Sequence, residues 1–86
     1  MSLSQIETFV TVVQTKSMSR AAERLHVAQP ALSRQIKSLE EELGTRLFAR
    51  TSRGMALLPE GEIFLEHARR ILDEIAAARR RFGAAK

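Results

Sequence analysis

The stretch of sequence that decides the fold lies at residues 17–44 and reads SMSRAAERLHVAQPALSRQIKSLEEELG. Ser17 is a favourable N-cap residue, so we expect a short helix to begin beside it. The small side chains of Ala21 and Ala22 would let another helix pack closely against this one. A break at residues 26–28 separates it from a longer helical pattern. The stretch therefore predicts a helix-turn-helix pair.

The second helix of this pair has one apolar face and one polar face. Pro30 suits its first turn, and Gly44 is a good stop. Apolar residues at three- and four-residue spacing predict a buried stripe of Leu32, Ile36, Leu39 and Leu43. The polar face carries Gln29, Ser33, Arg34 and Lys37. We expect the acidic run of Glu40, Glu41 and Glu42 near the end of this helix to be solvated.

The segments on either side of the pair extend this architecture. Residues 3–13 form one apolar helical face made of Leu3, Ile6, Phe9, Val10 and Val13. After the pair, residues 46–50 and 55–58 are predicted as two short strands around a turn at residues 51–54. Gly54 makes a tight hairpin plausible because glycine tolerates a positive φ.

A long helix is expected from Pro59 to Phe82, with proline at its first position. Its four-three apolar spacing is typical of a dimer seam, which would consist of Phe64, Ala68, Ile71, Ile75, Ala78 and Phe82. A second stripe of Leu65, Ala68, Leu72 and Ala76 could pack on the domain itself. The predicted fold is mainly α, with three helices and a short β-hairpin at residues 1–58 and a linker helix for dimerisation at residues 59–86.

Composition narrows the class of protein. The chain has 86 residues, no Cys and a formal net charge of +4, which favours polyanionic partners. Residues 45–58 contain no acidic residue; their basic residues are Arg46, Arg50 and Arg53. No apolar run could cross a membrane and no signal-peptide pattern is present, so we expect a cytoplasmic protein without a membrane partner. His26 and His67 lack metal-ligand spacing and no catalytic signature occurs, so we expect no metal, no cofactor and no enzymatic activity.

The polar face of the second helix suggests base recognition. In helix-turn-helix proteins, residues at the N-terminal end of this helix reach base edges in the major groove. Gln29, Ser33 and Arg34 occupy these positions by spacing; Gln can pair in two-pronged fashion with adenine, and Arg with guanine. On residue types alone, a solvated helix face is an equally good interpretation.

The predicted hairpin offers a second set of contacts. Arg53 at its tip could enter a narrow minor groove, where the potential is most negative, or could be an ordinary surface arginine. Arg46 and Arg50 are predicted to meet phosphates, and we place Thr51 with them. Contacts of this kind bind every DNA sequence alike.

At this point the residues resemble a known family, the LysR-type transcriptional regulators. The resemblance runs from about Leu3 to Leu72 and rests on residues 17–25 and 27–36. It continues in the pairs Leu39-Glu40, Leu43-Gly44 and Leu47-Phe48, and in Arg50 and Arg53-Gly54. The combination and order of these residues are highly specific.

The resemblance implies a winged helix-turn-helix domain whose linker helix pairs with that of a second subunit. It implies major-groove contacts from Gln29, Pro30, Ala31, Ser33 and Arg34, and a minor-groove contact from Arg53. It also implies phosphate contacts near Ser17, Ser19 and Lys37. Proteins of this family bind imperfect inverted repeats in double-stranded DNA upstream of regulated genes.

The chain departs from the family pattern in two places. The family usually has Leu-Thr before the linker helix, whereas this chain has Leu57-Leu58 before Pro59, so the usual Thr cap is lost. The family also carries a large C-terminal effector domain of two α/β lobes, which assembles tetramers and binds inducer. None of it is present in these residues, so we expect neither inducer binding nor tetramers from them.

Two functions of other classes compete with DNA binding. A protein-interaction module that dimerises through residues 59–82 and never binds DNA fits the seam equally well, but it does not require the unbalanced charge at residues 45–58. A basic amphipathic helix on a membrane surface fits poorly, because the last helix carries five acidic residues and no Trp.

Overall fold

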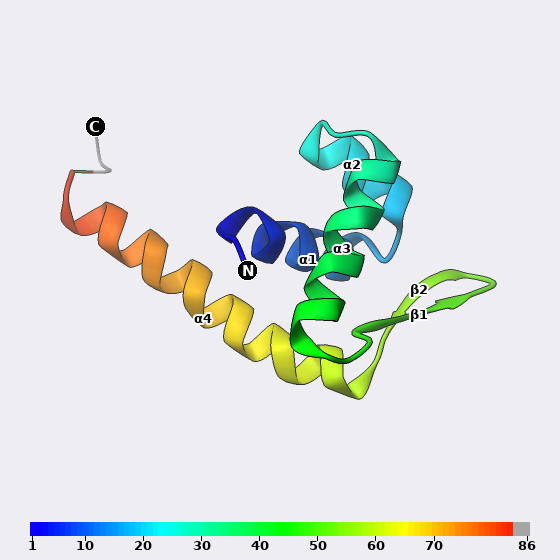
Figure 1. Ribbon diagram of the computed structural model, residues 1–86. Coiled ribbons are helices and arrows are strands. Elements are labelled where there is room, and N and C mark those ends of the chain that lie inside the picture. The colour runs from blue at the N-terminus through cyan, green and yellow to red at the C-terminus, as the bar shows by residue number, and fades with distance from the viewer. Residues whose placement is uncertain (84–86) are drawn as a thin grey trace.

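The computed structural model describes residues 1–83 and has four helices and one β-hairpin within them (Figure 1). The elements are α1 (Leu3–Thr15), α2 (Met18–Leu25), α3 (Gln29–Leu43), β1 (Phe48–Thr51), β2 (Gly54–Leu57) and α4 (Pro59–Arg81). The first three helices pack together, while the hairpin and the far end of α4 project from opposite sides of this body (Figure 1). The predicted winged helix-turn-helix architecture is therefore confirmed.

The helix boundaries follow the local signals in the sequence. Ser17 caps α2 by accepting a hydrogen bond from the backbone N–H of Arg20, and Gly44 ends α3 with a φ of 72°. Leu58 precedes α4 without a side-chain cap; the helix begins at Pro59, as predicted, and ends at Arg81, one residue before the predicted Phe82. The predicted linker extends to residue 86, of which residues 84–86 lie outside the described residues.

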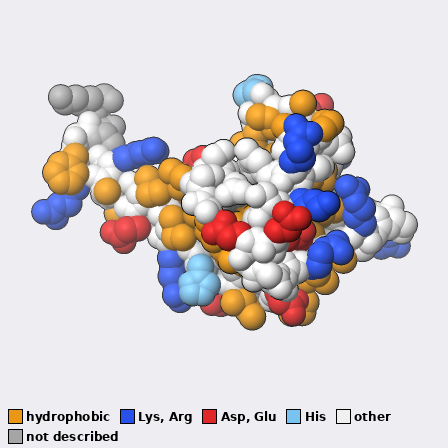
Figure 2. Space-filling view, in the orientation of Figure 1, with side chains coloured by type: hydrophobic (Ala, Val, Ile, Leu, Met, Phe, Trp, Pro, Cys, Tyr) orange, Lys and Arg blue, Asp and Glu red, His pale blue; other side chains and the backbone are white. Residues whose placement is uncertain are grey.

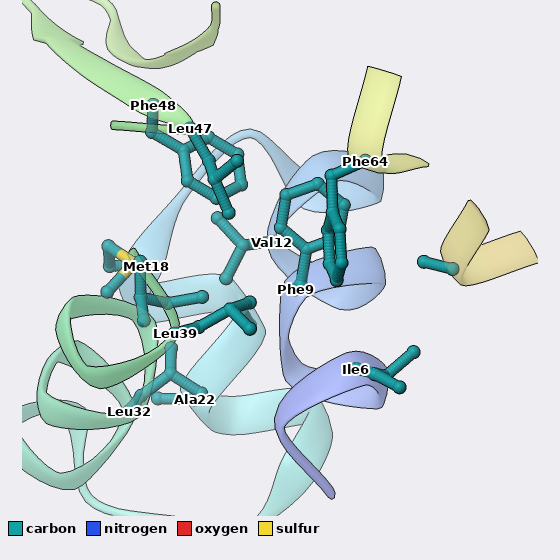
Figure 3. Close-up of a cluster of buried hydrophobic side chains, with 13 residues drawn as sticks. Ile6, Phe9, Val12, Met18, Ala22, Leu32, Leu39, Leu47, Phe48 and Phe64 are labelled. Atoms are coloured by element: carbon teal, nitrogen blue, oxygen red, sulfur yellow. The ribbon is translucent and has the colours of Figure 1, made fainter. Parts of the chain in front are cut away.

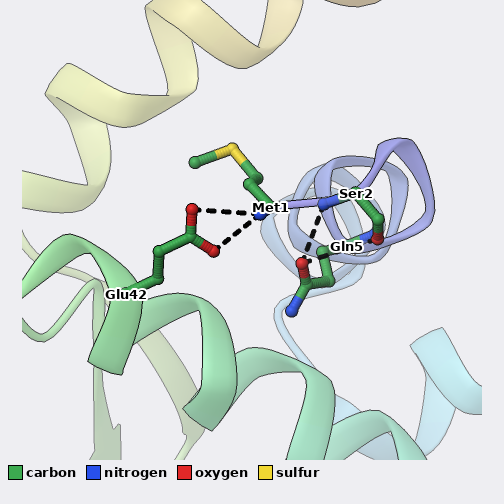
Figure 4. Close-up of polar contacts among 4 residues, drawn as sticks. All are labelled: Met1, Ser2, Gln5 and Glu42. Atoms are coloured by element: carbon green, nitrogen blue, oxygen red, sulfur yellow. Dashed lines mark hydrogen bonds and ion pairs between the residues drawn. The ribbon is translucent and has the colours of Figure 1, made fainter.

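The start of α1 is tied to the end of α3 (Figure 4). Ser2 and Gln5 form a reciprocal capping box, in which each side chain accepts a hydrogen bond from the backbone N–H of the other residue. The ammonium group of Met1 lies 2.8 Å from a carboxylate oxygen of Glu42. These contacts are at the surface, where an ion pair contributes little to stability.

Three aromatic rings link the helices, the wing and the linker helix (Figure 3). Phe9 of α1 is fully buried, with its ring centroid 5.3 Å from that of Phe48 in β1 and 4.9 Å from that of Phe64 in α4. Aromatic pairs at this separation stabilise a core beyond the area that they bury. The cluster extends through the buried residues Val12, Leu32, Leu39 and Leu47.

Two predictions about buried residues are corrected by this core. Leu43, predicted as the last member of the α3 stripe, is 36% exposed because it lies in the final turn, where the helix ends. Phe64, predicted for the dimer seam, is buried in the core of its own protomer; Ala68, predicted both for the seam and for the stripe that packs on the domain, is buried there too. The core thus crosses the predicted division at residues 58 and 59, and the first half of α4 belongs to the globular body.

The wing is a tight antiparallel hairpin that docks on the turn between α1 and α2. Its register pairs Phe48 with Leu57 and Thr51 with Gly54. Gly54 has a φ of 118°, and a Cβ at this position would lie 2.7 Å from the carbonyl oxygen of Lys16. The same carbonyl accepts a hydrogen bond from the backbone N–H of Met55 at 3.3 Å. Glycine is therefore required both by the backbone conformation and by this close approach.

The root of the wing is held by Glu40, which corrects the expectation that this residue is solvated. Its carboxylate accepts hydrogen bonds from the backbone N–H groups of Leu47 at 2.7 Å and Phe48 at 3.3 Å. Its side chain is 14% exposed and lies 3.8 Å from Nε of Arg46. Glu40 thus satisfies backbone donors that enter the core without a strand partner on that side.

Replacing Gly54 should destabilise the fold more than replacing a glycine with open space around it. Gly44 also has a positive φ, but a Cβ there would meet nothing within 4 Å. We expect Gly44→Ala to lower the free energy of unfolding by about 1 kcal/mol, and Gly54→Ala to lower it by at least about 1 kcal/mol more. Urea denaturation followed by circular dichroism at one protein concentration measures both. Equal losses of unfolding free energy in the two variants would show that the wing does not approach the carbonyl of Lys16 closely.

Removing the Glu40 carboxylate should leave backbone donors unpaired in the core. We expect Glu40→Ala to lower the free energy of unfolding by about 1–3 kcal/mol. The exposed neighbour Glu41 provides the control, because Glu41→Ala should change stability by less than about 0.5 kcal/mol. The same denaturation measurement applies, and similar values for the two variants would contradict the assignment.

Candidate nucleic-acid interface

The outward face of α3 presents the residues predicted to read bases. Pro30 and Arg34 are exposed on the side of α3 away from the apolar stripe, Gln29 is exposed as the first residue of the helix, and Ala31 and Ser33 are half-buried. Within residues 1–83, the side chains of Gln29, Ser33 and Arg34 form no hydrogen bond or ion pair with the rest of the protein. Their donors and acceptors are therefore available to a ligand.

The tip of the wing carries one exposed arginine. Arg53 lies in the two-residue turn between β1 and β2, where its backbone N–H donates a hydrogen bond to the hydroxyl of Thr51. Its side chain forms no hydrogen bond or ion pair with any of residues 1–83. The Thr51 hydroxyl also donates to the carbonyl of Gly54 at 3.1 Å. Thr51 thus closes the turn, and a phosphate contact would have to compete with these bonds.

A groove of about 600 Å³ separates α3 from the wing. Its floor is apolar and consists of Met18, Ile36, Phe48 and Met55. Lys37 and Arg50 lie along its edges with exposed side chains, and Glu41 lies among them. Lys and Arg side chains gather on the side of the molecule from which the wing projects (Figure 2). With Arg46 and Glu40 also in the lining, three basic and two acidic residues line the groove, which therefore has a small excess of positive charge between the two elements predicted to enter DNA grooves.

Two further residues predicted to meet phosphates also have structural roles. The Arg46 guanidinium donates a hydrogen bond to the carbonyl of Phe48 at 3.0 Å, although its side chain remains 69% exposed. Ser17 uses its hydroxyl as the α2 cap, and this oxygen lies 3.2 Å from that of the exposed Ser19. Ser17 and Ser19 therefore lie at the positive end of the α2 dipole, where an anion is favoured.

The far half of α4 carries an apolar edge that no other element within residues 1–83 covers. Ile71 is 38% exposed, Phe82 is 89% exposed, and Ala78 is also exposed, while Ile75 is half-buried. Of the second predicted stripe, Ala68 is buried, Leu65 and Leu72 pack against the core, and Ala76 is exposed. In the first half of α4, Ile63 is 63% exposed and lies off the four-three spacing of the predicted seam.

Neither a membrane span nor a metal cluster is found in residues 1–83. None of the helices in that range combines the length and the apolar character needed to cross a bilayer. No three potential metal-ligating side chains come together in the same range.

Comparison with known proteins places the chain in a family. The sequence profile described as bacterial regulatory helix-turn-helix protein, lysR family, matches residues 3–62. The HTH-type transcriptional regulator TfdT of Cupriavidus pinatubonensis is 41% identical over 85 residues, which cover 99% of this chain and 37% of TfdT. The regulator BenM of Acinetobacter baylyi is 45% identical over 75 residues, covering 87% of this chain and 25% of BenM. The chain thus spans well under half the length of these relatives.

Solved structures show the same architecture over nearly the whole chain. The DNA-binding domain of CbnR in complex with DNA aligns with a TM-score of 0.89 at 42% identity, covering 99% of this chain and 98% of that one. The BenM DNA-binding domain in complex with catB site 1 DNA aligns with a TM-score of 0.84 at 42% identity, covering 95% and 96%. With the sequence profile matching more than half of its residues, the chain belongs to the lysR family of bacterial regulatory helix-turn-helix proteins.

Proposed function

We propose that this chain binds double-stranded DNA sequence-specifically, as the DNA-binding part of a LysR-type transcriptional regulator. The observation that carries the proposal is the outward face of α3, whose Gln29, Ser33 and Arg34 side chains form no bond within residues 1–83. The groove between α3 and the wing and the Arg53 tip lie beside this face. The CbnR and BenM domains that align with the chain were solved with DNA, which supports the same ligand here.

The base contacts divide between the two DNA grooves. Arg34 pairs with guanine and Gln29 with adenine in the major groove, and Ser33 accepts or donates a single hydrogen bond. Pro30 and Ala31 supply apolar contacts, for which the thymine methyl group is the matching surface. Arg53 enters the minor groove, where a cation is favoured at narrow A·T tracts.

Phosphate contacts hold the protein in register on the duplex. Lys37 and Arg50 line the groove between α3 and the wing. In the proposed complex they contact the DNA strand that separates the major from the minor groove. The remaining contacts come from Ser17, Ser19, Arg46 and Thr51. These contacts provide affinity and orientation rather than sequence preference.

The far half of α4 pairs with a second copy of the chain. Its acidic residues Asp73 and Glu74 precede the basic run Arg79–Arg81. In an antiparallel pair centred between residues 76 and 77, Ile71 faces the partner's Phe82 and Ile75 faces the partner's Ala78. Glu74 and Arg81 lie on one flank of this edge, so Glu74 comes beside the partner's Arg81. A parallel pair would instead bring like charges together. Complementary charges of this kind set the orientation of paired helices.

With this pairing, the two parts of the chain have different proposed roles. Residues 1–58 contact DNA and residues 59–86 join two copies, although the first half of α4 also completes the core. Tetramers would require the effector domain that family members carry. The protein acts in the cytoplasm, where bacterial DNA is found.

Selection from a randomised duplex library at near-physiological salt tests the proposed function. We expect an enriched inverted repeat with half-sites about one or two helical turns apart, because two recognition helices are related by two-fold symmetry. Enrichment of a single half-site would contradict the dimer. Absence of enrichment, with binding that disappears as salt rises, would favour a protein-interaction module instead.

Arg34 and Lys37 should differ in what they contribute to binding. Arg34→Ala should cost about 1–3 kcal/mol on the selected site and relax the preference at one base pair. Lys37→Ala should weaken binding to all sequences alike and reduce the salt dependence by about one unit of slope. Fluorescence anisotropy with selected and scrambled duplexes at several salt concentrations measures both. An equal loss on the two duplexes for Arg34→Ala would remove it from base readout.

A further inference from the structure

The rotation of α3 about its own axis decides which side chains face a ligand. Its buried stripe of Leu32, Ile36 and Leu39 prevents a large rotation but allows small ones, since apolar contacts have no preferred direction. Side-chain tips lie about 5–6 Å from a helix axis, so a rotation of about 20° moves them by about 2 Å. This displacement exceeds the tolerance of a hydrogen bond to a base edge.

Two polar contacts restrain α3 on opposite sides of the stripe. At about 100° per residue, Gln35 and Glu40 each lie about 70° from the centre of the stripe, one on either side. Glu40 is bonded to the backbone of the wing root. Gln35 is bonded to α1, where the hydroxyl of Thr8 donates to its Oε1 at 2.6 Å. One contact without the other would leave α3 free to turn toward the unrestrained side.

The Thr8–Gln35 hydrogen bond has the features of a positioning contact. Thr8 is only 4% exposed, so its hydroxyl is shielded from solvent. Within residues 1–83, this is the one side-chain hydrogen bond that joins α1 to α3. Gln35 directly follows Arg34 in the same turn of the helix. Hydrogen bonds are directional, whereas the neighbouring apolar contacts are not.

We propose that Thr8 is a positioning residue for DNA specificity, which acts through Gln35 to fix the rotation of α3 and therefore the direction of Ser33 and Arg34. The proposal rests on the proposed function, because specificity is what the rotation controls. Phosphate contacts through the long, flexible side chains of Lys37 and Arg50 tolerate a small rotation. Loss of the hydroxyl should therefore weaken the selected complex and leave general DNA affinity unchanged.

The test compares Thr8→Val, which has nearly the same shape, with Thr8→Ser, which keeps the hydroxyl. Thr11→Val is the matched control, because Thr11 is also buried in α1 and donates only to the carbonyl of Glu7 in its own helix, at 2.8 Å. Dissociation constants are measured by anisotropy on the selected site and on a scrambled duplex of equal length. Their ratio reports sequence discrimination, a property that a merely structural role would not change.

We expect Thr8→Val to reduce this ratio about 3- to 10-fold with an unchanged constant for the scrambled duplex. Thr8→Ser and Thr11→Val should keep the wild-type ratio. The double variant Thr8→Val/Gln35→Met should lose no more discrimination than Thr8→Val alone, because both changes break one bond.

Three results would overturn the proposal. They are an unchanged ratio for Thr8→Val, an equal loss for Thr11→Val, and additive losses in the double variant. If the wild-type chain discriminates and Thr8→Val discriminates as well, only the role of Thr8 is refuted. If the wild-type chain itself does not discriminate between the two duplexes, the proposed function is refuted together with the role of Thr8.

Discussion

The buried ring of Phe9 is the contact on which the rest of the structure depends. It stands in α1, yet its neighbours Phe48 and Phe64 come from the wing and the linker helix, so one side chain joins three parts of the molecule. A chain of 86 residues buries a small core, in which each large ring accounts for a substantial share of the apolar contact. The wing and the linker helix therefore hold their positions through the same cluster that holds the helices.

The polar contacts around this core fix how the elements are oriented relative to one another. Apolar packing sets which elements meet but leaves small rotations and shifts open. Gly54 lets the hairpin approach the carbonyl of Lys16. Glu40 accepts hydrogen bonds from backbone N–H groups at the wing root, and Gln35 accepts one from the hydroxyl of Thr8. Each of these contacts lies between elements rather than within one. Together they set the angle between the recognition helix and the wing.

The candidate interface lies on the elements whose orientation these contacts fix. Residues proposed to read bases stand on a helix that is restrained on both flanks, and the proposed minor-groove arginine stands on a hairpin anchored at its root. Side chains proposed for phosphates are longer and more exposed, which suits contacts that need charge but little geometry. The far half of α4 carries an exposed apolar edge, which is the surface proposed to pair with a second copy.

The sequence by itself determined the identity and order of the elements, because their signals are local. Caps, stops and turns such as Ser17, Gly44 and the Ser52-Arg53 turn act within a few residues, and the polar face of α3 follows from its period. The family resemblance rested on the same local strings, and the sequence profile confirmed it.

Only the tertiary structure decided which partner each face meets. Phe64 and Ala68 share the seam spacing with Ile71 and Ile75, because a helix shows the same period whether it packs on its own domain or on a second copy. The second stripe allowed for the burial of Ala68, but the burial of Phe64 against the core could not be read from that period. In the sequence, nothing distinguishes Glu40 from its neighbours Glu41 and Glu42. Its role depends on hydrogen bonds from the backbone N–H groups of residues 47 and 48, which reach it only after the chain has turned back. A hydrogen-bond partner supplied by another element is set by how the elements pack, and this information is not local to any stretch of the chain.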